Sequence, residues 1–266
     1  MKHIYNYMRH DRKYDSGFSD TIRGMLWLYH TFDPQAYRVH LLIREEITIS
    51  RILKAAEVTN KDYPYEWWFH NNVESVRNAI ENSEEDFYGT VVCYDLADDC
   101  FSDPNSLQNQ WCRQLYEYRE PYETEVENRC RELVGSDPFR VIICRCGDYV
   151  FNGMTIEKDI RRRIVRAMVT EKSDGKSLFV CDVPEIAEEV LAQRSDFVPY
   201  VFTPCFLPTY TGSEEGCLPI LTALRLIIRA KKVHSYHRWS WGSSGFGWWP
   251  AKIFHVPFQF FSLQIH

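Results

Sequence analysis

The sequence has no pair of cysteines at the two-residue spacing of zinc sites and redox motifs. Its nine cysteines are scattered between Cys93 and Cys217, and the closest two, Cys144 and Cys146, would point to opposite faces of a strand. An odd, scattered set gives no evident disulfide framework. We therefore expect buried thiols in a reducing compartment and no metal site.

Long apolar runs are also missing. No stretch approaches the roughly 20 apolar residues that cross a membrane, and the first residues, MKHIYNYMRHDRKYDSG, lack the apolar core of a signal peptide. Nor is there a basic excess, because 31 lysines and arginines stand against 37 acidic residues, for a net charge of -6. This balance disfavours a general nucleic-acid binder. We expect a cytoplasmic protein with no membrane span and no nucleic-acid partner.

Two common enzyme motifs are absent. No G-x-G-x-x-G follows an expected strand, which disfavours an NAD-dependent enzyme. No G-x-S-x-G occurs, which disfavours a hydrolase with a serine nucleophile at such an elbow.

What the sequence does have is an apolar content of 45%, enough for a packed core, and a regular alternation of strands and helices. Strands are expected at 3–8, 37–43, 87–97, 139–145, 177–182, 197–202 and 232–236. Helices are expected at 21–32, 46–58, 71–83, twice within 105–134, and at 155–172, 184–193, 214–230 and 245–254.

Such alternation is typical of parallel α/β sheets. The segment Gly135-Ser136-Asp137-Pro138 interrupts the pattern, which then restarts. We predict two facing Rossmann-like domains, residues 1–135 and 136–266. Because ligands of such sheets bind at the carboxyl ends of the strands, we expect a ligand cleft between the two halves.

Polar residues follow several of the expected strands. Arg145 ends the first strand of the second half, and its planar fork of donors matches phosphate oxygens; it would otherwise pair with Asp148 or another acid at the strand end. Asp182 ends the next strand, where it would accept hydrogen bonds from a purine or a sugar, or cap the following helix.

The stretch SWGSSGFGWWPAKIF places small residues where a helix begins. Ser243, Ser244 and Gly245 there would offer backbone N–H groups to a phosphate. The aromatic residues beside them, Phe246 among them, line the site or belong to the core.

In this combination the sequence resembles the fucosyltransferase-like glycosyltransferases, the superfamily of the α1,2-, α1,6- and protein O-fucosyltransferases and of a nodulation fucosyltransferase. IICRCGDYV (142–150) is similar to H-(V/I)-R-R-G-D-Y-V, with Arg145 on its first arginine. FVCDVPE (179–185) is similar to (F/L)-x-(S/T)-D-D-P-E, with Asp182 on one of its acids. SSGFGWWPA (243–251) is similar to N-S-S-F-G-W-W-A-A, and DSGFSDTIRG (15–24) to the loop G-(F/L)-G-(D/N)-x-(L/I).

These four motifs stand in the family's order, and the resemblance covers about half of the chain. It implies a GT-B architecture with the nucleotide sugar held mainly by the C-terminal domain, inversion at the anomeric carbon, and no essential metal or cofactor beyond the nucleotide-sugar co-substrate. The positions of the family's base-contacting histidine and second arginine hold Ile143 and Cys146. The donor therefore stays open between GDP-fucose and a UDP-sugar such as UDP-xylose.

We predict an inverting, metal-independent glycosyltransferase that moves fucose or a related sugar such as xylose to a hydroxyl of a glycan or glycoprotein. The alternative is a non-catalytic nucleotide- or carbohydrate-binding module. Arg145 would stabilise the leaving diphosphate, and Asp20 would assist the acceptor hydroxyl or else cap the helix expected from Thr21. The predicted donor-binding residues are Gly17, Phe18, Arg23, Arg145, Asp148, Asp182, Ser243, Ser244, Gly245 and Phe246.

Two further clusters are interpreted as structural first. The basic run between Lys158 and Arg166 is interleaved with acids and is expected to be an exposed helix face. The aromatic residues Tyr63, Tyr65, Trp67 and Trp68 are expected in the core, with stacking on an acceptor sugar as the alternative.

Overall fold

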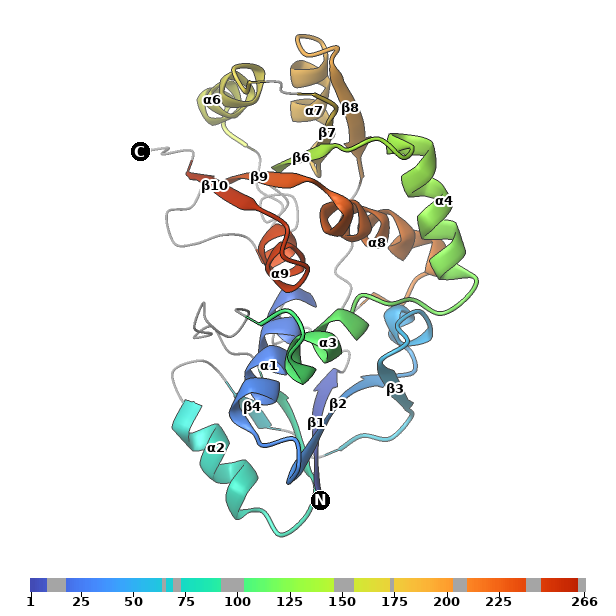
Figure 1. Ribbon diagram of the computed structural model, residues 1–266, viewed down its shortest axis with the longest axis vertical. Coiled ribbons are helices and arrows are strands. Elements are labelled where there is room, and N and C mark those ends of the chain that lie inside the picture. The colour runs from blue at the N-terminus through green and yellow to red at the C-terminus, as the bar shows by residue number, and fades with distance from the viewer. Residues whose placement is uncertain are drawn as a thin grey trace. The chain divides into compact units, whose positions relative to one another are not determined.

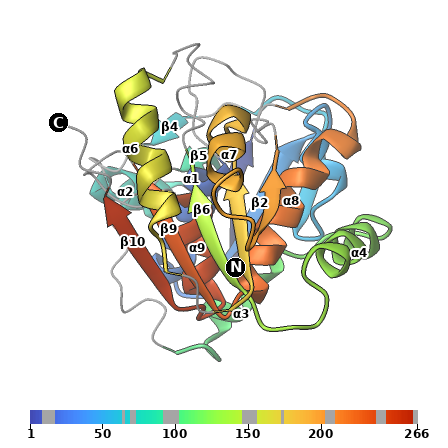
Figure 2. The same ribbon diagram turned by 90° about the horizontal axis from the view of Figure 1, so that it is seen from above.

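The fold comes from a computed structural model of the chain (Figures 1 and 2). It describes residues 1–8, 18–63, 66–68, 73–91, 103–145, 156–172, 175–202, 210–237 and 245–262. Two compact units make up the structure. The N-terminal unit comprises Met1–Glu123 and Cys205–Cys217, and the C-terminal unit comprises Thr124–Pro204 and Leu218–His266.

The N-terminal unit contains a five-stranded parallel sheet in the order β3-β2-β1-β5-β4. Its strands are β1 (Lys2–Met8), β2 (Tyr37–Arg44), β3 (Ala56–Thr59), β4 (Glu66–Trp68) and β5 (Phe87–Val91). Helix α1 (Phe18–Thr31) packs against β1, β2 and β5 through its buried apolar side. The other helical segments are the short 3-10 helix η1 (Thr48–Arg51), α2 (Val73–Asn82) and α3 (Leu107–Gln114).

The carboxyl end of β5 is held between β1 and α1. Asn6 of β1 is fully buried, accepts a hydrogen bond from the Val91 N–H at 2.9 Å and donates one to the Val91 carbonyl at 3.4 Å. Gly24 of α1 lies against the same carbonyl, where an added Cβ would come within 1.7 Å of the oxygen. This close approach accounts for a glycine inside a helix, where glycine otherwise costs about 1 kcal/mol relative to alanine.

The C-terminal unit contains a second five-stranded parallel sheet, in the order β10-β9-β6-β7-β8. Its strands are β6 (Arg140–Cys144), β7 (Ser177–Cys181), β8 (Phe197–Val201), β9 (Lys232–His237) and β10 (Phe258–Ser262). Its helices are α4 (Tyr122–Val134), α6 (Lys158–Val169), α7 (Pro184–Leu191), α8 (Glu214–Arg229) and α9 (Gly245–Ile253).

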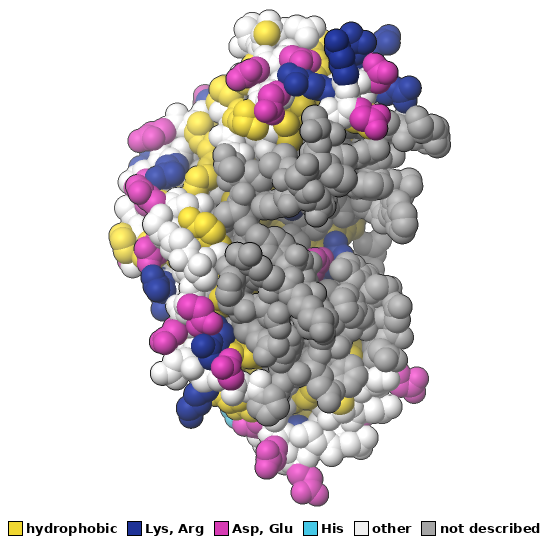
Figure 3. Space-filling view, turned by 180° about the vertical axis from the view of Figure 1, so that it is seen from behind, with side chains coloured by type: hydrophobic (Ala, Val, Ile, Leu, Met, Phe, Trp, Pro, Cys, Tyr) yellow, Lys and Arg dark blue, Asp and Glu magenta, His cyan; other side chains and the backbone are white. Residues whose placement is uncertain are grey.

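Helices cover both faces of this second sheet (Figures 1 and 2). On one face α6 and α7 pack with Ile142, Cys144 and Phe179 into a core cluster, and on the other Gly247 of α9 lies against Ile143. Every residue of β6 and β7 is consequently buried, as is usual for the central strands of a parallel sheet. The solvent side of α6 carries Lys158 and several arginines. Figure 3 shows lysine and arginine side chains gathered at the top of the view.

The predicted α/β class is confirmed, and most predicted helices and strands appear within a few residues of their expected bounds. The strand expected at 87–97 is described as far as Val91. The edge strands β4 and β10 were not predicted. The described cysteines, Cys112, Cys130, Cys144, Cys181 and Cys217, are buried thiols outside any disulfide, as expected. Within the described ranges, no helix is both long enough and apolar enough to cross a membrane.

The helix predicted at 46–58 is wrong. That segment forms η1 and, after a turn, the edge strand β3. Thr48 makes two bonds to a distant segment of its own unit, from its N–H to the Tyr210 carbonyl and from its hydroxyl to the Gly212 carbonyl, both at 2.8 Å. Ile47, Ile49, Ile52 and Leu53 are all fully buried. Tertiary contacts therefore determine the structure of this segment. Because it is buried on several sides, its apolar residues recur at a spacing that resembles that of an amphipathic helix.

We expect Gly24→Ala to lower the free energy of unfolding by about 3 kcal/mol, because the new methyl group overlaps a main-chain oxygen that cannot move alone. Urea denaturation measures the change. Gly135→Ala is the control, since Gly135 has a φ of +64° and no atom near its would-be Cβ, so its loss reflects only backbone strain of about 1 kcal/mol. Equal losses in the two variants would contradict the steric explanation.

Candidate functional site

The carboxyl ends of β6 and β7 bring Arg145 and Asp182 together. The strands are neighbours in register, with Cys144 opposite Cys181, so the residues that follow them are level. Arg145 Nε lies 3.9 Å from Asp182 Oδ2. The distance exceeds that of a hydrogen bond, so this contact is an electrostatic one and not a bidentate fork. The Asp182 side chain is only 3% exposed, whereas that of Arg145 is 28% exposed.

An aromatic floor lies beside this ion pair. The Phe246 ring centroid is 5.2 Å from the Arg145 guanidinium carbon, within the range of a cation–π contact. Phe202, which follows β8, has its ring 6.2 Å from that of Phe246 and donates its N–H to the Cys181 carbonyl at 3.2 Å. Both phenylalanines are buried. The apolar floor strengthens any electrostatic contact that Arg145 makes, because it displaces water.

The start of α9 joins the same site. Gly245 and Phe246 are its first residues and both are buried. The first N–H groups of a helix have no partner within the helix and favour an anion. Three segments predicted from sequence to bind a donor, around residues 145, 182 and 245–246, are therefore adjacent at one edge of the C-terminal sheet.

One alternative from the sequence can be tested. The N-cap position of α7 is Val183 and not Asp182, and the Val183 side chain makes no capping hydrogen bond. The described acid beside Arg145 is Asp182, while Asp148 lies outside the described residues. Gly17, Ser243 and Ser244 lie outside them as well.

The remaining predicted residues belong to the N-terminal unit and form a separate group. Helix α1 begins at Phe18, so Asp20 lies within its first turn and cannot cap a helix that starts at Thr21. Arg23 Nη1 is 3.4 Å from Asp20 Oδ1. A carboxylate in a first helical turn interacts favourably with the helix dipole. Asp20 keeps partial exposure, at 22% of its side chain.

The aromatic cluster expected near residue 65 is described only in part. The Tyr63 ring stacks on Tyr88 at 4.1 Å, and Tyr88 stacks on Tyr5 at 4.6 Å. One face of Tyr63 is therefore covered by another ring. Tyr65 and the side chains of Trp67 and Trp68 lie outside the described residues.

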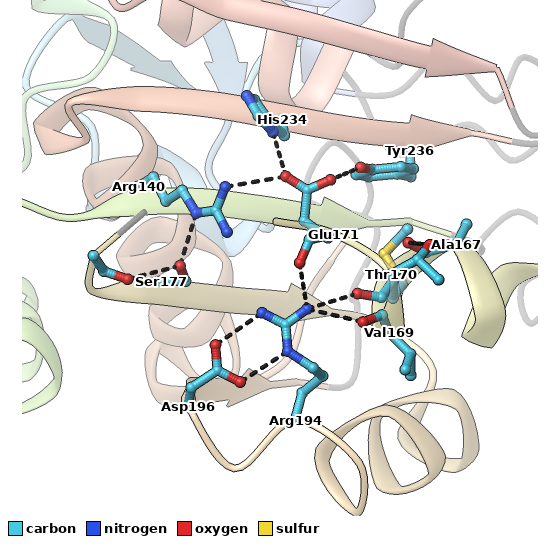
Figure 4. Close-up of polar contacts among 12 residues, drawn as sticks. Arg140, Ala167, Val169, Thr170, Glu171, Ser177, Arg194, Asp196, His234 and Tyr236 are labelled. Carbon is cyan, nitrogen blue, oxygen red and sulfur yellow. Dashed lines mark hydrogen bonds and ion pairs between the residues drawn. The ribbon is translucent and has the colours of Figure 1, made fainter. Parts of the chain in front are cut away.

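Sequence reasoning missed a largely buried polar network in the same unit, centred on Glu171 (Figure 4). The Glu171 carboxylate accepts hydrogen bonds from Arg140 Nη1 at 3.0 Å and from the Tyr236 hydroxyl, and is 2.8 Å from His234 Nδ1. Arg140 Nε donates to Ser177 Oγ at 2.7 Å. One carboxylate thus connects β6 and β9 directly, and β7 through Arg140.

Arg194 binds the main chain that leads into Glu171. Its Nη1 donates to the carbonyls of Met168, Val169 and Glu171 at 3.2, 3.2 and 2.6 Å, and its other donors bind both oxygens of Asp196 at 2.8 Å (Figure 4). The cation therefore satisfies carbonyls at the end of α6, which have no partner within the helix.

The network also controls ionisation. Burial alone would raise the pKa of Glu171, but the hydrogen bonds from Tyr236 and His234 and the charge of Arg140 lower it overall. Burial and the neighbouring carboxylate raise the pKa of Tyr236, which stays a neutral donor. These residues hold the sheet in place and supply no nucleophile. No group of three metal-ligating side chains occurs among the residues described.

Comparison with known proteins places this fold among solved glycosyltransferases. No protein-family model matches the chain, and no curated protein matches it significantly. NodZ alpha-1,6-fucosyltransferase co-crystallized with GDP aligns with a TM-score of 0.53 and 11% identity, over 96% of this chain and 92% of that one. The fucosyltransferase NodZ from Bradyrhizobium aligns with a TM-score of 0.53 and 11% identity, over 96% and 93%.

A mutant of Arabidopsis thaliana FUT1 in complex with GDP aligns with a TM-score of 0.60 and 11% identity, over 97% of this chain and 70% of that one. Identity this low establishes the fold alone. The chain has a fucosyltransferase-like fold, as the motifs predicted.

We expect stability to depend on pH through Glu171. A carboxyl whose pKa is lowered by folding stabilises the protein fully above its usual pKa of 4.5, and this contribution disappears as pH falls from there through the folded value. Glu171→Gln should lose about 3 kcal/mol at neutral pH, since Arg140 is left buried without its counter-charge, and should lack this acid-dependent component. Urea titrations at a series of pH values measure both.

The control for this prediction is Glu188→Gln, which changes an exposed carboxyl of α7. A Glu171→Gln protein with the stability and acid dependence of the control would contradict the role given to the network.

Proposed function

We propose that the chain is a glycosyltransferase that uses a nucleotide-sugar donor, and that the Arg145–Asp182–Phe246 site binds the donor's diphosphate. The observation that carries the proposal is the meeting of these residues at the carboxyl edge of a parallel sheet, where ligands of such folds bind. The fold supports it, since two fucosyltransferases that share it were crystallised with GDP.

Arg145 is the principal catalytic residue of this proposal. When the sugar–phosphate bond breaks, negative charge grows on the leaving nucleoside diphosphate. A guanidinium whose environment is already arranged stabilises that charge without reorganising at the moment of reaction. The cation–π contact with Phe246 and the contact with Asp182 hold the guanidinium at the strand end before the donor arrives.

Asp182 and the start of α9 complete the donor site. The buried Asp182 carboxylate accepts hydrogen bonds from the base or sugar of the donor. The N–H groups at Gly245 and Phe246 supply further donors to phosphate oxygens, with Ser243, Ser244 and Asp148 as additional donor-site residues in this proposal. Most of the predicted donor-binding residues thus lie within residues 136–266, and Gly17, Phe18 and Arg23 are the predicted exceptions.

The acceptor side is assigned to residues 1–135. Asp20 assists the attacking hydroxyl as a hydrogen-bond acceptor or base, and Arg23, its partner at 3.4 Å, orients it. Phe18 is the first residue of the same helix, and Gly17 precedes it in the sequence. Attack opposite the leaving group inverts the anomeric centre, and Arg145 supplies the charge neutralisation that a metal ion would otherwise provide.

The buried thiols support a cytoplasmic setting.

A thermal-shift screen against GDP, UDP, GDP-fucose and UDP-xylose tests donor binding. A ligand at a hundred times its dissociation constant adds about 2.7 kcal/mol of stability. Transfer of labelled sugar to a glycan hydroxyl then separates a transferase from a binding module. Stabilisation by a nucleotide without any transfer would favour the module.

We expect Arg145→Ala to reduce turnover about a hundredfold, because the lost contact is strongest in the transition state. Arg145→Lys should recover only part of it, since an ammonium lacks the fork. Transfer rates and melting temperatures are measured for both, with Arg131→Ala, an exposed arginine of α4, as the control.

The structural explanation makes a different prediction. If Arg145 only neutralises Asp182, then Arg145→Ala and Asp182→Asn should lower the melting temperature while transfer continues. A destabilised Arg145→Ala protein with normal turnover would refute the catalytic role.

A further inference from the structure

Helix α6 presents three arginines on one solvent-facing side. Arg162, Arg163 and Arg166 are exposed. Arg166 lies four residues from Arg162 and three from Arg163, so it is a surface neighbour of both; we call the three the α6 basic face. The opposite side of the helix, with Ile160, Ile164, Val165 and Met168, is buried in the core of the C-terminal unit. The apolar side thus fixes the orientation of the arginines.

These arginines differ from Arg161 on the same helix. Arg161 Nη2 contacts Glu189 Oε1 at 2.6 Å and the Glu185 carbonyl at 3.0 Å, and so ties α6 to α7. Arg162 has one carboxylate neighbour, Asp159 at 3.4 Å, in a pair whose side chains are 66% and 84% exposed. Exposed pairs of this kind are weak.

The other two arginines are less engaged still. With the residues that the structure describes, the guanidinium groups of Arg163 and Arg166 form no ion pair and no hydrogen bond. The exposed Lys158 and Lys172 extend the same positive region beyond the ends of the face. A protein with a net charge of -6 therefore carries a local reversal of sign along one helix.

We propose that the α6 basic face docks on the surface of a bilayer that contains anionic phospholipid. The three arginines span about 6 Å along the helix axis on one solvent-facing side, which lets them contact a planar layer of phosphates together. Charges beyond about 8 Å are screened at physiological salt, so a flat surface touching this face interacts mainly with its cations and little with the acidic remainder.

The chemistry of the face favours a lipid surface over nucleic acid. None of the exposed large hydrophobic side chains in the described part of the chain lies on α6. The face therefore has no aromatic platform of the kind on which single-stranded nucleic acids stack. A polymer longer than the face would also meet the acidic remainder of the protein. Charge alone carries the association, so it is peripheral and salt-dependent, and it is independent of the proposed transferase activity.

Cosedimentation with vesicles tests the proposal. The intact protein should bind vesicles of phosphatidylcholine mixed with phosphatidylserine, and not vesicles of phosphatidylcholine alone. Each cation near such a surface contributes about fivefold to the partition coefficient. The triple variant Arg162→Gln, Arg163→Gln, Arg166→Gln should therefore bind about a hundredfold more weakly. Raising the salt toward 1 M, where the Debye length falls to about 3 Å, should abolish binding of the intact protein.

Two further triple variants separate a local surface from total charge. The first removes three positive charges from exposed positions elsewhere, in the variant Lys54→Gln, Arg131→Gln, Lys231→Gln. It should bind like the intact protein. Replacing the three α6 arginines with lysine should preserve binding, because charge and not the fork is used.

Four results with vesicles would overturn the proposal. For the intact protein, they are no binding to the charged vesicles at low salt, or equal binding to both kinds of vesicle. For the variants, they are equal losses of binding in the two glutamine triples, or loss of binding in the lysine triple. Binding to duplex DNA through the same arginines without binding to vesicles would overturn it in favour of nucleic acid. Circular dichroism of each variant checks that its fold is intact.

Discussion

The C-terminal unit depends on the contacts that the Glu171 carboxylate makes with its neighbours. A buried charge is costly unless several donors surround it, and here Arg140, His234 and Tyr236 all contact the same carboxyl group. Those partners lie on β6 and β9, and Arg140 also reaches β7 through Ser177. Because β6 lies between β9 and β7 in the sheet, a single side chain links three neighbouring strands. The candidate donor site is built where two of these strands end.

A second arginine–carboxylate pair lies at the other end of the same strands, and the contrast between the two pairs is informative. Arg140 begins β6 and is nearly inaccessible, at 4% exposure, with its partner oxygen at 3.0 Å. Arg145 follows β6, is 28% exposed, and has its partner at 3.9 Å. The Arg140–Glu171 pair is thus the shorter and more buried of the two, and the Arg145–Asp182 pair is the longer and more exposed. Under the proposed function, an arriving anion replaces Asp182 as the partner of Arg145.

The sequence predicted what depends on local pattern. Buried strands, amphipathic helices and the polar residues at strand ends all have short-range signatures. These signatures single out Arg145, Asp182 and Phe246, which the structure brings close together. The Glu171 network has no such signature, because its partners lie 31, 63 and 65 residues away along the chain. The short edge strands β4 and β10 and the segment from Thr48 to Thr59 depend equally on distant contacts, as the Thr48 bonds to Tyr210 and Gly212 show.

The core also limits how the proposed site can read a donor's base. The resemblance places a base-contacting histidine at the position of Ile143, but Ile143 is 1% exposed and lies against Gly247 of α9. This position therefore contributes to the contact between sheet and helix and offers no polar group to a ligand. Under the proposed function, recognition of the base falls to polar groups at the sheet edge, of which Asp182 is the buried one. A carboxylate accepts paired N–H donors, which guanine presents and uracil does not, so under the same proposal a guanine donor would fit Asp182 better than a uracil donor.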